Sequence, residues 1–123
     1  MITINELRTG NLLWYDTAEG DILTTSIDWQ DLKWLDEDPK GFNLVHTAIT
    51  LTEEWLVKMG LKPEDGKFKT TNWSGLFFEY SSQWHLKRST NNGIIDICYG
   101  FEHVHQLQNL YFALIGDELI INQ

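Results

Sequence analysis

A period-two pattern of apolar side chains runs through residues 75–99, which read GLFFEYSSQWHLKRSTNNGIIDICY. Such alternation is typical of strands with one buried face. Three or four strands are predicted in and just before this stretch, at residues 67–72, 75–80, 84–89 and 94–99. The turn sequence Asn91-Asn92-Gly93 favours a tight hairpin. The sequence therefore predicts an antiparallel β-meander.

A short helix with both ends specified is predicted just before the meander, in the segment LTEEWLVKMG at residues 51–60. Thr52 has the hydroxyl of a good N-cap, and Glu53 and Glu54 suit the positive end of the helix dipole. Gly60 fits the left-handed position that ends a helix. The buried stripe is expected to consist of Trp55, Leu56 and Met59.

A second, amphipathic helix is predicted at residues 102–115 and is expected to end at Gly116. Its apolar stripe consists of Val104, Leu107, Tyr111 and Leu114. We expect this helix to cover the meander, which gives two layers around one core. Residues 117–123 are expected to form a brief terminal strand or an extended tail.

The first fifty residues read mainly as strands. Residues 7–16 and 22–27 predict a hairpin, residues 29–38 are ambiguous in period and are assigned to a strand, and residues 42–49 predict a further strand. The expected fold is thus α+β in a single small domain. Residues 1–50 form a barrel-like N-terminal β subunit, and residues 51–123 form the short helix, the meander and the C-terminal helix.

Composition supports one globular domain that carries a strong negative charge. The 123 residues are 42% hydrophobic and 22% charged, and the formal net charge is −9. A chain with this charge repels a phosphate backbone unless its basic residues are gathered into a patch. We therefore expect nucleic acid to be an unfavourable partner.

The single cysteine, Cys98, excludes an intrachain disulfide and favours a reducing compartment. Its apolar neighbours on a predicted strand indicate a packed, structural thiol. The first residues lack the basic and apolar regions of a secretory signal, and the longest stretch without charged side chains, residues 103–116, is shorter than the roughly 20 residues that cross a bilayer. A cytoplasmic protein with no membrane contact is expected.

Motifs of catalysis are missing from the sequence. It contains no Gly-x-Ser-x-Gly elbow, no phosphate-binding glycine loop and no Cys-x-x-Cys. The acidic run of residues 36–38 lacks the order of a calcium-binding loop and indicates a solvated loop. We predict no catalytic residue, no cofactor and no metal ligand, which favours a protein that is not an enzyme.

Histidines provide the main alternative to that conclusion. His103 and His105 are two residues apart, and on a helix they would point to opposite sides, which argues against a shared metal. If the helix starts later, these side chains with Glu102 or Asp96 could form a metal-assisted hydrolase. His46 and His85 lie on predicted strands without a carboxylate at ligand spacing, and we interpret them as ordinary strand residues.

Tryptophans suggest a contact surface. Trp29 and Trp34 stand among acidic residues, where they either are exposed for a partner or cap the core of the N-terminal subunit. The leading hypothesis is a non-enzymatic interaction module for a protein or peptide partner, and a homo-oligomer stays open. A weak nucleic-acid binder is a further alternative, based on a group of basic and aromatic residues: Lys67, Lys69, Lys87 and Arg88 with Trp73 and Trp84.

Three segments resemble a family of small proteins found in bacterial genomes and in phages or integrated elements. The first is ELRTGN at residues 6–11, the second is LTEEWL followed by MGL, and the third is VHQLQNLYFAL followed by GDEL. The resemblance covers about a third of the chain and implies one domain of shared architecture and an association with phages. That family has no assigned activity, so it implies no catalytic residue.

The polar positions of the third segment lie outside the apolar stripe of the predicted helix. They are His105, Gln106, Gln108 and Asn109. These side chains either hydrogen-bond to neighbouring strands and loops or present a recognition surface.

Overall fold

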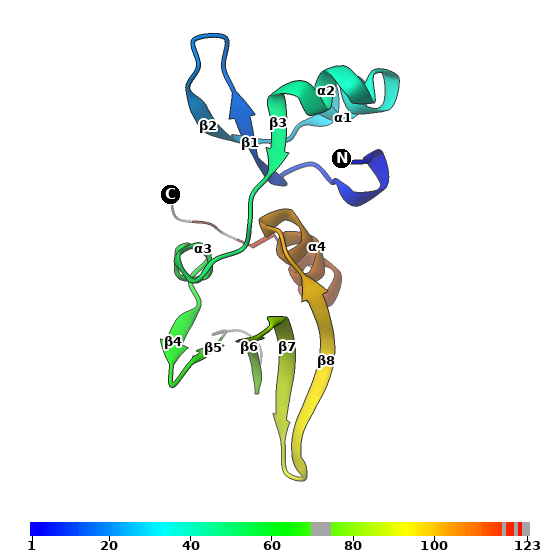
Figure 1. Cartoon of the computed structure of the whole chain (residues 1–123). Coiled ribbons are helices and arrows are strands. Elements are labelled where there is room, and N and C mark those ends of the chain that lie inside the picture. Colours follow the sequence, from blue (N-terminus) through cyan, green and yellow to red (C-terminus); the bar gives the residue numbers. More distant parts are fainter. Residues whose placement is uncertain (70–74, 117, 120, 122–123) are drawn as a thin grey trace. The chain divides into compact units, whose positions relative to one another are not determined.

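The computed structural model describes residues 1–69, 75–116, 118, 119 and 121. Helices and two antiparallel sheets together confirm the predicted α+β class (Figure 1). Contacts between Cα atoms divide the chain into two compact units. Unit 1 consists of Met1–Thr50 and His103–Glu118, and unit 2 consists of Leu51–Glu102 and Leu119–Gln123.

Unit 1 contains a small sheet flanked by helices (Figure 1). Its elements are the 3-10 helix η1 (Ile4–Glu6), β1 (Leu12–Asp16), β2 (Ile22–Ser26), α1 (Trp29–Glu37), α2 (Pro39–Val45), β3 (His46–Ala48) and α4 (Val104–Ile115). The predicted β1–β2 hairpin is confirmed, with Leu12 paired to Ser26 and Asp16 to Ile22. The strand order β2-β1-β3 is an open three-stranded sheet, so the barrel-like prediction is wrong.

Two helices, α1 and α2, occupy most of the region that was predicted as strands at residues 29–38 and 42–49. Asp28 caps α1, because its carboxylate accepts from the Asp31 N–H and the Asp31 carboxylate accepts from the Asp28 N–H, at 2.9 and 3.0 Å. Asp38 accepts from Gly41 N–H, and Pro39 occupies the first position of α2. These caps outweigh the β propensity of the aromatic and branched residues, and only β3 remains of the predicted second strand.

The core of unit 1 joins the sheet to its helices. It consists of Ile2, Leu7, Leu13, Ile27, Leu35 and Phe42, with Leu32 and Ala48 packed against it. On α4, Val104 and Leu107 are also fully buried, whereas Leu114 at the far end of the predicted stripe is 49% exposed. Gly116 ends α4 in the left-handed conformation, as predicted.

Helix α4 groups with the N-terminal sheet in unit 1, whereas it was predicted to belong with the meander. Polar side chains on α4 fix this placement: Gln108 bonds to the backbone of Gly10 and Leu12, and Asn109 bonds to Asn11 and Glu6. These amides hydrogen-bond to β1 and to the segment that precedes it. Of the two predicted roles, bonding to neighbouring strands and loops or presenting a recognition surface, Gln108 and Asn109 have the first. The first segment of unit 1 ends at Thr50, and α4 lies in its second segment, His103–Glu118.

Unit 2 begins with the predicted short helix, α3 (Glu53–Lys58). Thr52 Oγ1 accepts from the Trp55 N–H at 3.4 Å, which confirms the N-cap. Gly60 has a φ of +86° and so confirms the predicted stop. The predicted stripe is buried, because Trp55, Leu56 and Met59 are 7%, 0% and 4% exposed.

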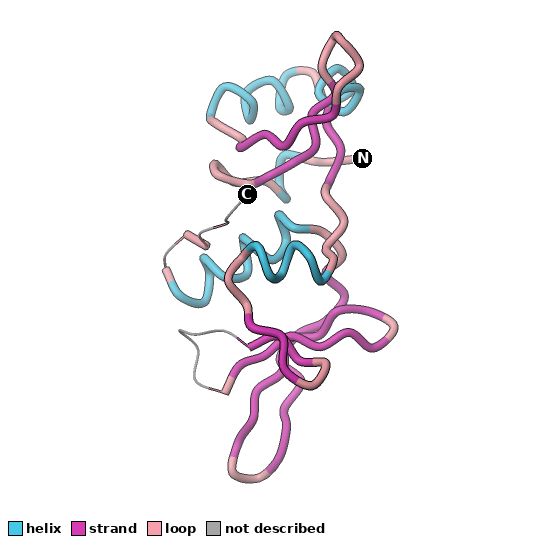
Figure 2. The backbone as a smooth tube through the Cα atoms, turned by 90° about the vertical axis from the view of Figure 1, so that its left-hand side faces the viewer, coloured by secondary structure: helices cyan, strands magenta, loops and turns pink. Residues whose placement is uncertain are grey.

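Five strands in sequential order make up the sheet of unit 2, and they confirm the antiparallel meander (Figures 1 and 2). They are β4 (Lys62–Glu64), β5 (Lys67–Lys69), β6 (Leu76–Ser81), β7 (Gln83–Thr90) and β8 (Gly93–Phe101). The sequence did not predict β4. One face of the sheet buries Phe68, Phe78, Trp84 and Leu86. The second half of the predicted strand 67–72 and part of the predicted tail 117–123 lie outside the described residues.

Strand β8 is the last strand of the meander, and in the described part of the chain its outer edge pairs with no other strand. Its register with β7 shifts twice, so that Ile97 and Gly100 have no direct partner on β7. These irregularities are β-bulges, which are common at sheet edges. The β7–β8 hairpin extends beyond β6 (Figure 1).

Candidate functional site

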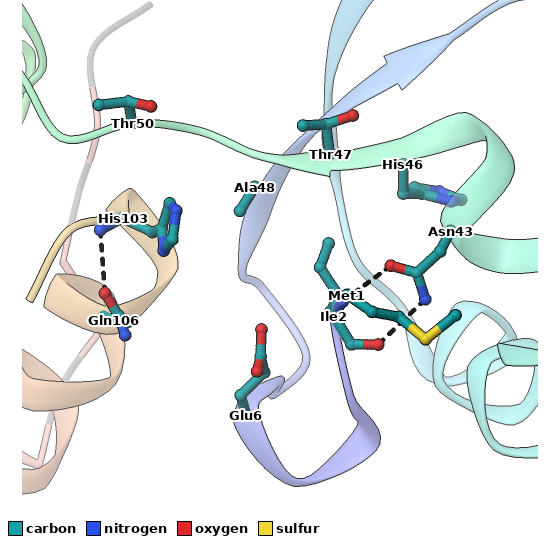
Figure 3. Close-up of a pocket in the computed structure, with 10 residues that line it drawn as sticks. All are labelled: Met1, Ile2, Glu6, Asn43, His46, Thr47, Ala48, Thr50, His103 and Gln106. Atoms are coloured by element: carbon teal, nitrogen blue, oxygen red, sulfur yellow. Dashed lines mark hydrogen bonds between the residues drawn. The ribbon is translucent and has the colours of Figure 1, made fainter. Parts of the chain in front are cut away.

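A pocket of about 640 Å³ lies within unit 1 (Figure 3). Its ten lining residues come from the first residues of the chain, from α2 and β3 with the segment after it, and from the beginning of α4. A volume of this size is in the range of small-molecule sites, roughly 300–1,000 Å³. No sequence pattern indicated this pocket, because its walls come from three separate stretches of chain.

One wall of the pocket is held by a reciprocal pair of hydrogen bonds. Ile2 N–H donates to Asn43 Oδ1 at 2.8 Å, and Asn43 Nδ2 donates to the carbonyl oxygen of Ile2 at 3.0 Å (Figure 3). Asn43 Nδ2 also donates to the carbonyl oxygen of Pro39 at 2.8 Å. The N-terminal segment is therefore fixed to α2 on this side of the pocket.

The opposite wall is formed by the start of α4. His103 precedes the helix, and its N–H donates to Gln106 Oε1 at 2.9 Å. In Figure 3 the His103 ring and the Glu6 side chain both extend toward the space next to Ala48. Glu6 is the only aspartate or glutamate among the lining residues, and the lining contains no lysine or arginine.

Behind this wall, Glu6 contacts the buried His105. The distance from His105 Nε2 to Glu6 Oε1 is 3.4 Å, and the His105 side chain is 1% exposed. Burial lowers the pKa of His105, and the Glu6 carboxylate acts in the opposite direction. His105 Nδ1 is buried and has no hydrogen-bond partner among the described residues.

The His103 and His105 rings lie side by side, in contrast to the predicted arrangement on opposite sides of a helix. Their centroids are 5.6 Å apart and their planes differ by 11°. The reason is that His103 has extended backbone angles, φ −126° and ψ 152°, so the helical rotation between positions two apart does not apply. Within the described part of the chain, no three histidine, cysteine, aspartate or glutamate side chains are grouped to hold a metal ion. The predicted hydrolase therefore gains no third ligand from these residues.

His46, by contrast, lies in an aromatic cluster. Its ring stacks on the Phe42 ring, with the two centroids 3.8 Å apart. The centroid of the Trp34 ring, which meets it edge-on, lies 5.4 Å away, and that of the tilted Tyr15 ring lies 5.1 Å away. His46 Nδ1 donates to the carbonyl oxygen of Phe42 at 2.9 Å, because a carbonyl can only accept. This buried ring supports the packing of α2 against the sheet.

The two tryptophans of the predicted interaction surface are both exposed, but to different degrees. Trp29 is 65% exposed at the start of α1. Trp34 is 37% exposed and contacts Phe42 and His46 edge-on, so its ring is partly engaged in packing. Trp29 thus presents the more accessible ring.

A second exposed apolar surface lies on β8, where no sequence pattern predicted one. We call it the β8 strip, and it consists of Ile94, Ile95, Ile97 and Tyr99, which are 57%, 54%, 44% and 67% exposed. Next to it, His85 Nδ1 contacts Asp96 Oδ2 at 3.0 Å, and the His85 ring lies 5.6 Å from the Tyr99 ring. No carboxylate stands at ligand spacing from His85 in the sequence, and the β7–β8 pairing brings Asp96 beside it.

The basic residues of the predicted nucleic-acid surface are partly neutralised. Lys69 pairs with Glu64 at 3.2 Å, and Lys87 pairs with Glu79 at 2.8 Å, which raises the pKa of Lys87. Trp84 is buried, with its Nε1–H donating to the Leu51 carbonyl oxygen at 3.2 Å. Trp73 lies outside the described residues. These contacts do not favour a nucleic-acid function.

Cys98 is partly buried, and burial raises the pKa of its thiol. A raised pKa disfavours the reactive thiolate. This environment agrees with the predicted structural role.

No family model, curated protein or solved structure matches the chain. None of the helices in the described part of the chain has the length and apolarity needed to cross a bilayer.

Proposed function

We propose that this protein is a non-enzymatic interaction module that binds a protein or peptide partner through the β8 strip. The observation that carries the proposal is the exposure of four large apolar side chains on one edge strand, between 44% and 67%. Exposed apolar side chains mark sites of interaction, and because Ile94 and Ile95 pair with consecutive residues of β7, both faces of the β8 edge present them. The predicted partner class is retained, and the β8 strip replaces the tryptophans as the main contact.

The shape of β8 supports contact through side chains in preference to an added strand. A peptide that extends a sheet needs a regular row of backbone groups at the edge. The bulges at Ile97 and Gly100 interrupt this row, as edge bulges do in proteins that avoid edge-to-edge pairing. The partner is therefore expected to cover the isoleucines and Tyr99 with its own apolar surface.

Paired substitutions test the proposal. The double variant Ile94→Thr and Ile95→Thr removes apolar area and keeps β-branched residues in the strand. The matched control is Ile22→Thr and Leu23→Thr on β2, where the side chains are 63% and 55% exposed. A photo-crosslinking residue at position 97 reports the partner in cells of the native source.

We expect a defined crosslinked adduct that the β8 double variant loses and the β2 double variant retains. The proposal would be contradicted if position 97 gave no adduct, or if both double variants lost it equally. A photo-crosslinking residue at position 29 provides a second test. An adduct at position 29 and none at position 97 would indicate that the partner binds around Trp29 and not at the β8 strip.

We further propose a cytoplasmic location and an association with phages or integrated elements. The first rests on the single cysteine, Cys98, and the second rests on the resemblance of the three segments. Cell fractionation tests the location, and the neighbouring genes of the native source test the association.

A further inference from the structure

We propose that the pocket of unit 1 binds an organic cation with N–H donors, an alkylammonium or guanidinium group, with Glu6 as its counter-ion. This site is separate from the β8 strip and does not depend on the proposed partner. The pocket has the volume of a small-molecule site and is open to solvent at the Glu6 side chain, which is 40% exposed.

Charge selects the class of ligand. Glu6 is the only carboxylate in the lining, and no lysine or arginine in the described part of the chain forms an ion pair with it. Its contacts are His105 Nε2 at 3.4 Å and the Thr3 hydroxyl at 3.4 Å. A carboxylate has about four acceptor positions, so Glu6 retains capacity for a charged donor.

The geometry around Glu6 suits a flat or compact cation. Figure 3 shows the Glu6 side chain and the His103 ring on two sides of the space beside Ala48. A guanidinium group placed there could stack on the imidazole while its N–H groups meet the carboxylate. Ala48, which lines the pocket beside both, has a small side chain.

Titration of the full-length, ¹⁵N-labelled protein tests the site by NMR. The probes are n-butylammonium and n-butylguanidinium, a short end-blocked peptide with one lysine or one arginine, and neutral n-butanol as control. Saturable shifts are expected at the amides of Thr47, Thr50, His103 and Gln106 for the cations and not for n-butanol. Comparable affinity of the small cations and the peptides would indicate a free amine as ligand, and at least tenfold tighter binding of a peptide would indicate a side chain of a partner protein.

Variants distinguish binding in this pocket from non-specific electrostatic attraction of cations to the negatively charged protein. Glu6→Gln keeps a hydrogen-bonding side chain and should weaken binding at least tenfold, whereas Glu19→Gln, in an exposed turn of the same unit, should leave binding unchanged. Ala48→Leu retains the charge and fills the space, and it should also abolish binding. The spectrum of each variant reports whether it is folded.

The proposal is overturned if no probe gives saturable shifts at these amides, or if n-butanol binds as well as the cations. It is equally overturned if folded Glu6→Gln or folded Ala48→Leu binds like the wild type.

Discussion

Gln108 Oε1 accepts a hydrogen bond from the backbone N–H of Leu12 at 2.8 Å, across 96 positions of the chain. The same amide donates through Nε2 to the carbonyl oxygen of Gly10 at 3.0 Å, and the Gln108 side chain is 3% exposed. One buried side chain thus satisfies two backbone groups at the entry to β1. Water cannot replace these bonds without opening the contact between α4 and the sheet.

Replacement of Gln108 by leucine should therefore destabilise the protein strongly. The change leaves a buried N–H and a partly buried carbonyl without partners; the first costs about 1–3 kcal/mol and the second somewhat less. We expect the free energy of unfolding in urea to fall by about 2–5 kcal/mol. Ala113→Leu introduces the same residue at an exposed position of α4 and should change stability by less than about 0.5 kcal/mol. Equal effects of the two substitutions would contradict the role of Gln108.

Acid should destabilise the protein through His105. Burial lowers the pKa of His105 in the folded state below the ordinary value of 6.5, so the unfolded chain takes up the proton first. The contribution of neutral His105 to the free energy of unfolding is complete above about pH 6.5. It decreases as the pH is lowered through that value and stops changing below the folded-state pKa of His105. Urea unfolding between pH 7.5 and 5.0 measures this slope, which for one proton is at most about 1.4 kcal/mol per pH unit.

Histidine variants assign that slope to one residue. His105→Asn should reduce the pH dependence of the unfolding free energy, whatever its effect on stability at neutral pH. His85→Asn, on the surface of unit 2, is the matched control and should retain the component from His105. If the two variants kept the same slope as the wild type, His105 would not be the group responsible.

Glycine at position 75 is required both by backbone conformation and by space. Its φ is +75°, and an added Cβ would lie 2.9 Å from the carbonyl oxygen of Ser89. Gly66 in the same unit has a φ of +78° and open space around the Cβ position. We expect Gly66→Ala to cost about 1–2 kcal/mol from the left-handed conformation alone. Gly75→Ala should cost at least about 1 kcal/mol more, because the clash with backbone adds to the strain. Urea midpoints of both variants provide the comparison.

Capping by Thr52 should contribute measurably to unit 2. Thr52→Ala removes the acceptor for the Trp55 N–H and should lower the unfolding free energy by about 1 kcal/mol. Thr52→Ser keeps a hydroxyl at the same position and should restore most of that loss. A serine variant as unstable as the alanine variant would show that the threonine methyl group, and not the cap, is responsible.

The parts of the fold that were predicted correctly are those encoded by neighbouring residues. Helix α3 follows from Thr52, the two glutamates and Gly60, which lie within one short segment. The β7–β8 hairpin follows from the turn at Asn92 and Gly93. That turn sets the register as far as the Lys87–Asp96 pair, so a position for Asp96 diagonally across from His85 could have been derived from it.

Errors arose where local signals competed or where contacts depend on tertiary structure. Residues 29–45 combine β-forming side chains with helix caps, and the Asp28–Asp31 spacing was the signal that would have identified α1. The apolar stripe of α4 predicted a helix correctly but carries no information on which sheet it meets. The polar pair Gln108 and Asn109 decides this, through bonds to residues about a hundred positions away.

The pocket could not have been derived from any local pattern. Glu6 and Asn43 are unremarkable in sequence, and His103 stood out only as a possible metal ligand. The three line one pocket because unit 1 assembles segments that are far apart in the chain. The His103 and His105 arrangement likewise depends on the residue at which α4 begins, which periodicity does not determine to within one position.

Because residues 51–102 are inserted between the two segments of unit 1, synthesis on the ribosome imposes an order on maturation. The meander and α3 are complete in sequence before α4 has been translated, whereas the N-terminal sheet must wait for Gln108 and Asn109 to leave the exit tunnel. During that interval the backbone groups of Gly10 and Leu12 remain available to chaperones or to strands of other chains. A nascent chain that ends before α4 therefore leaves the Gly10 carbonyl and the Leu12 N–H without their native partners.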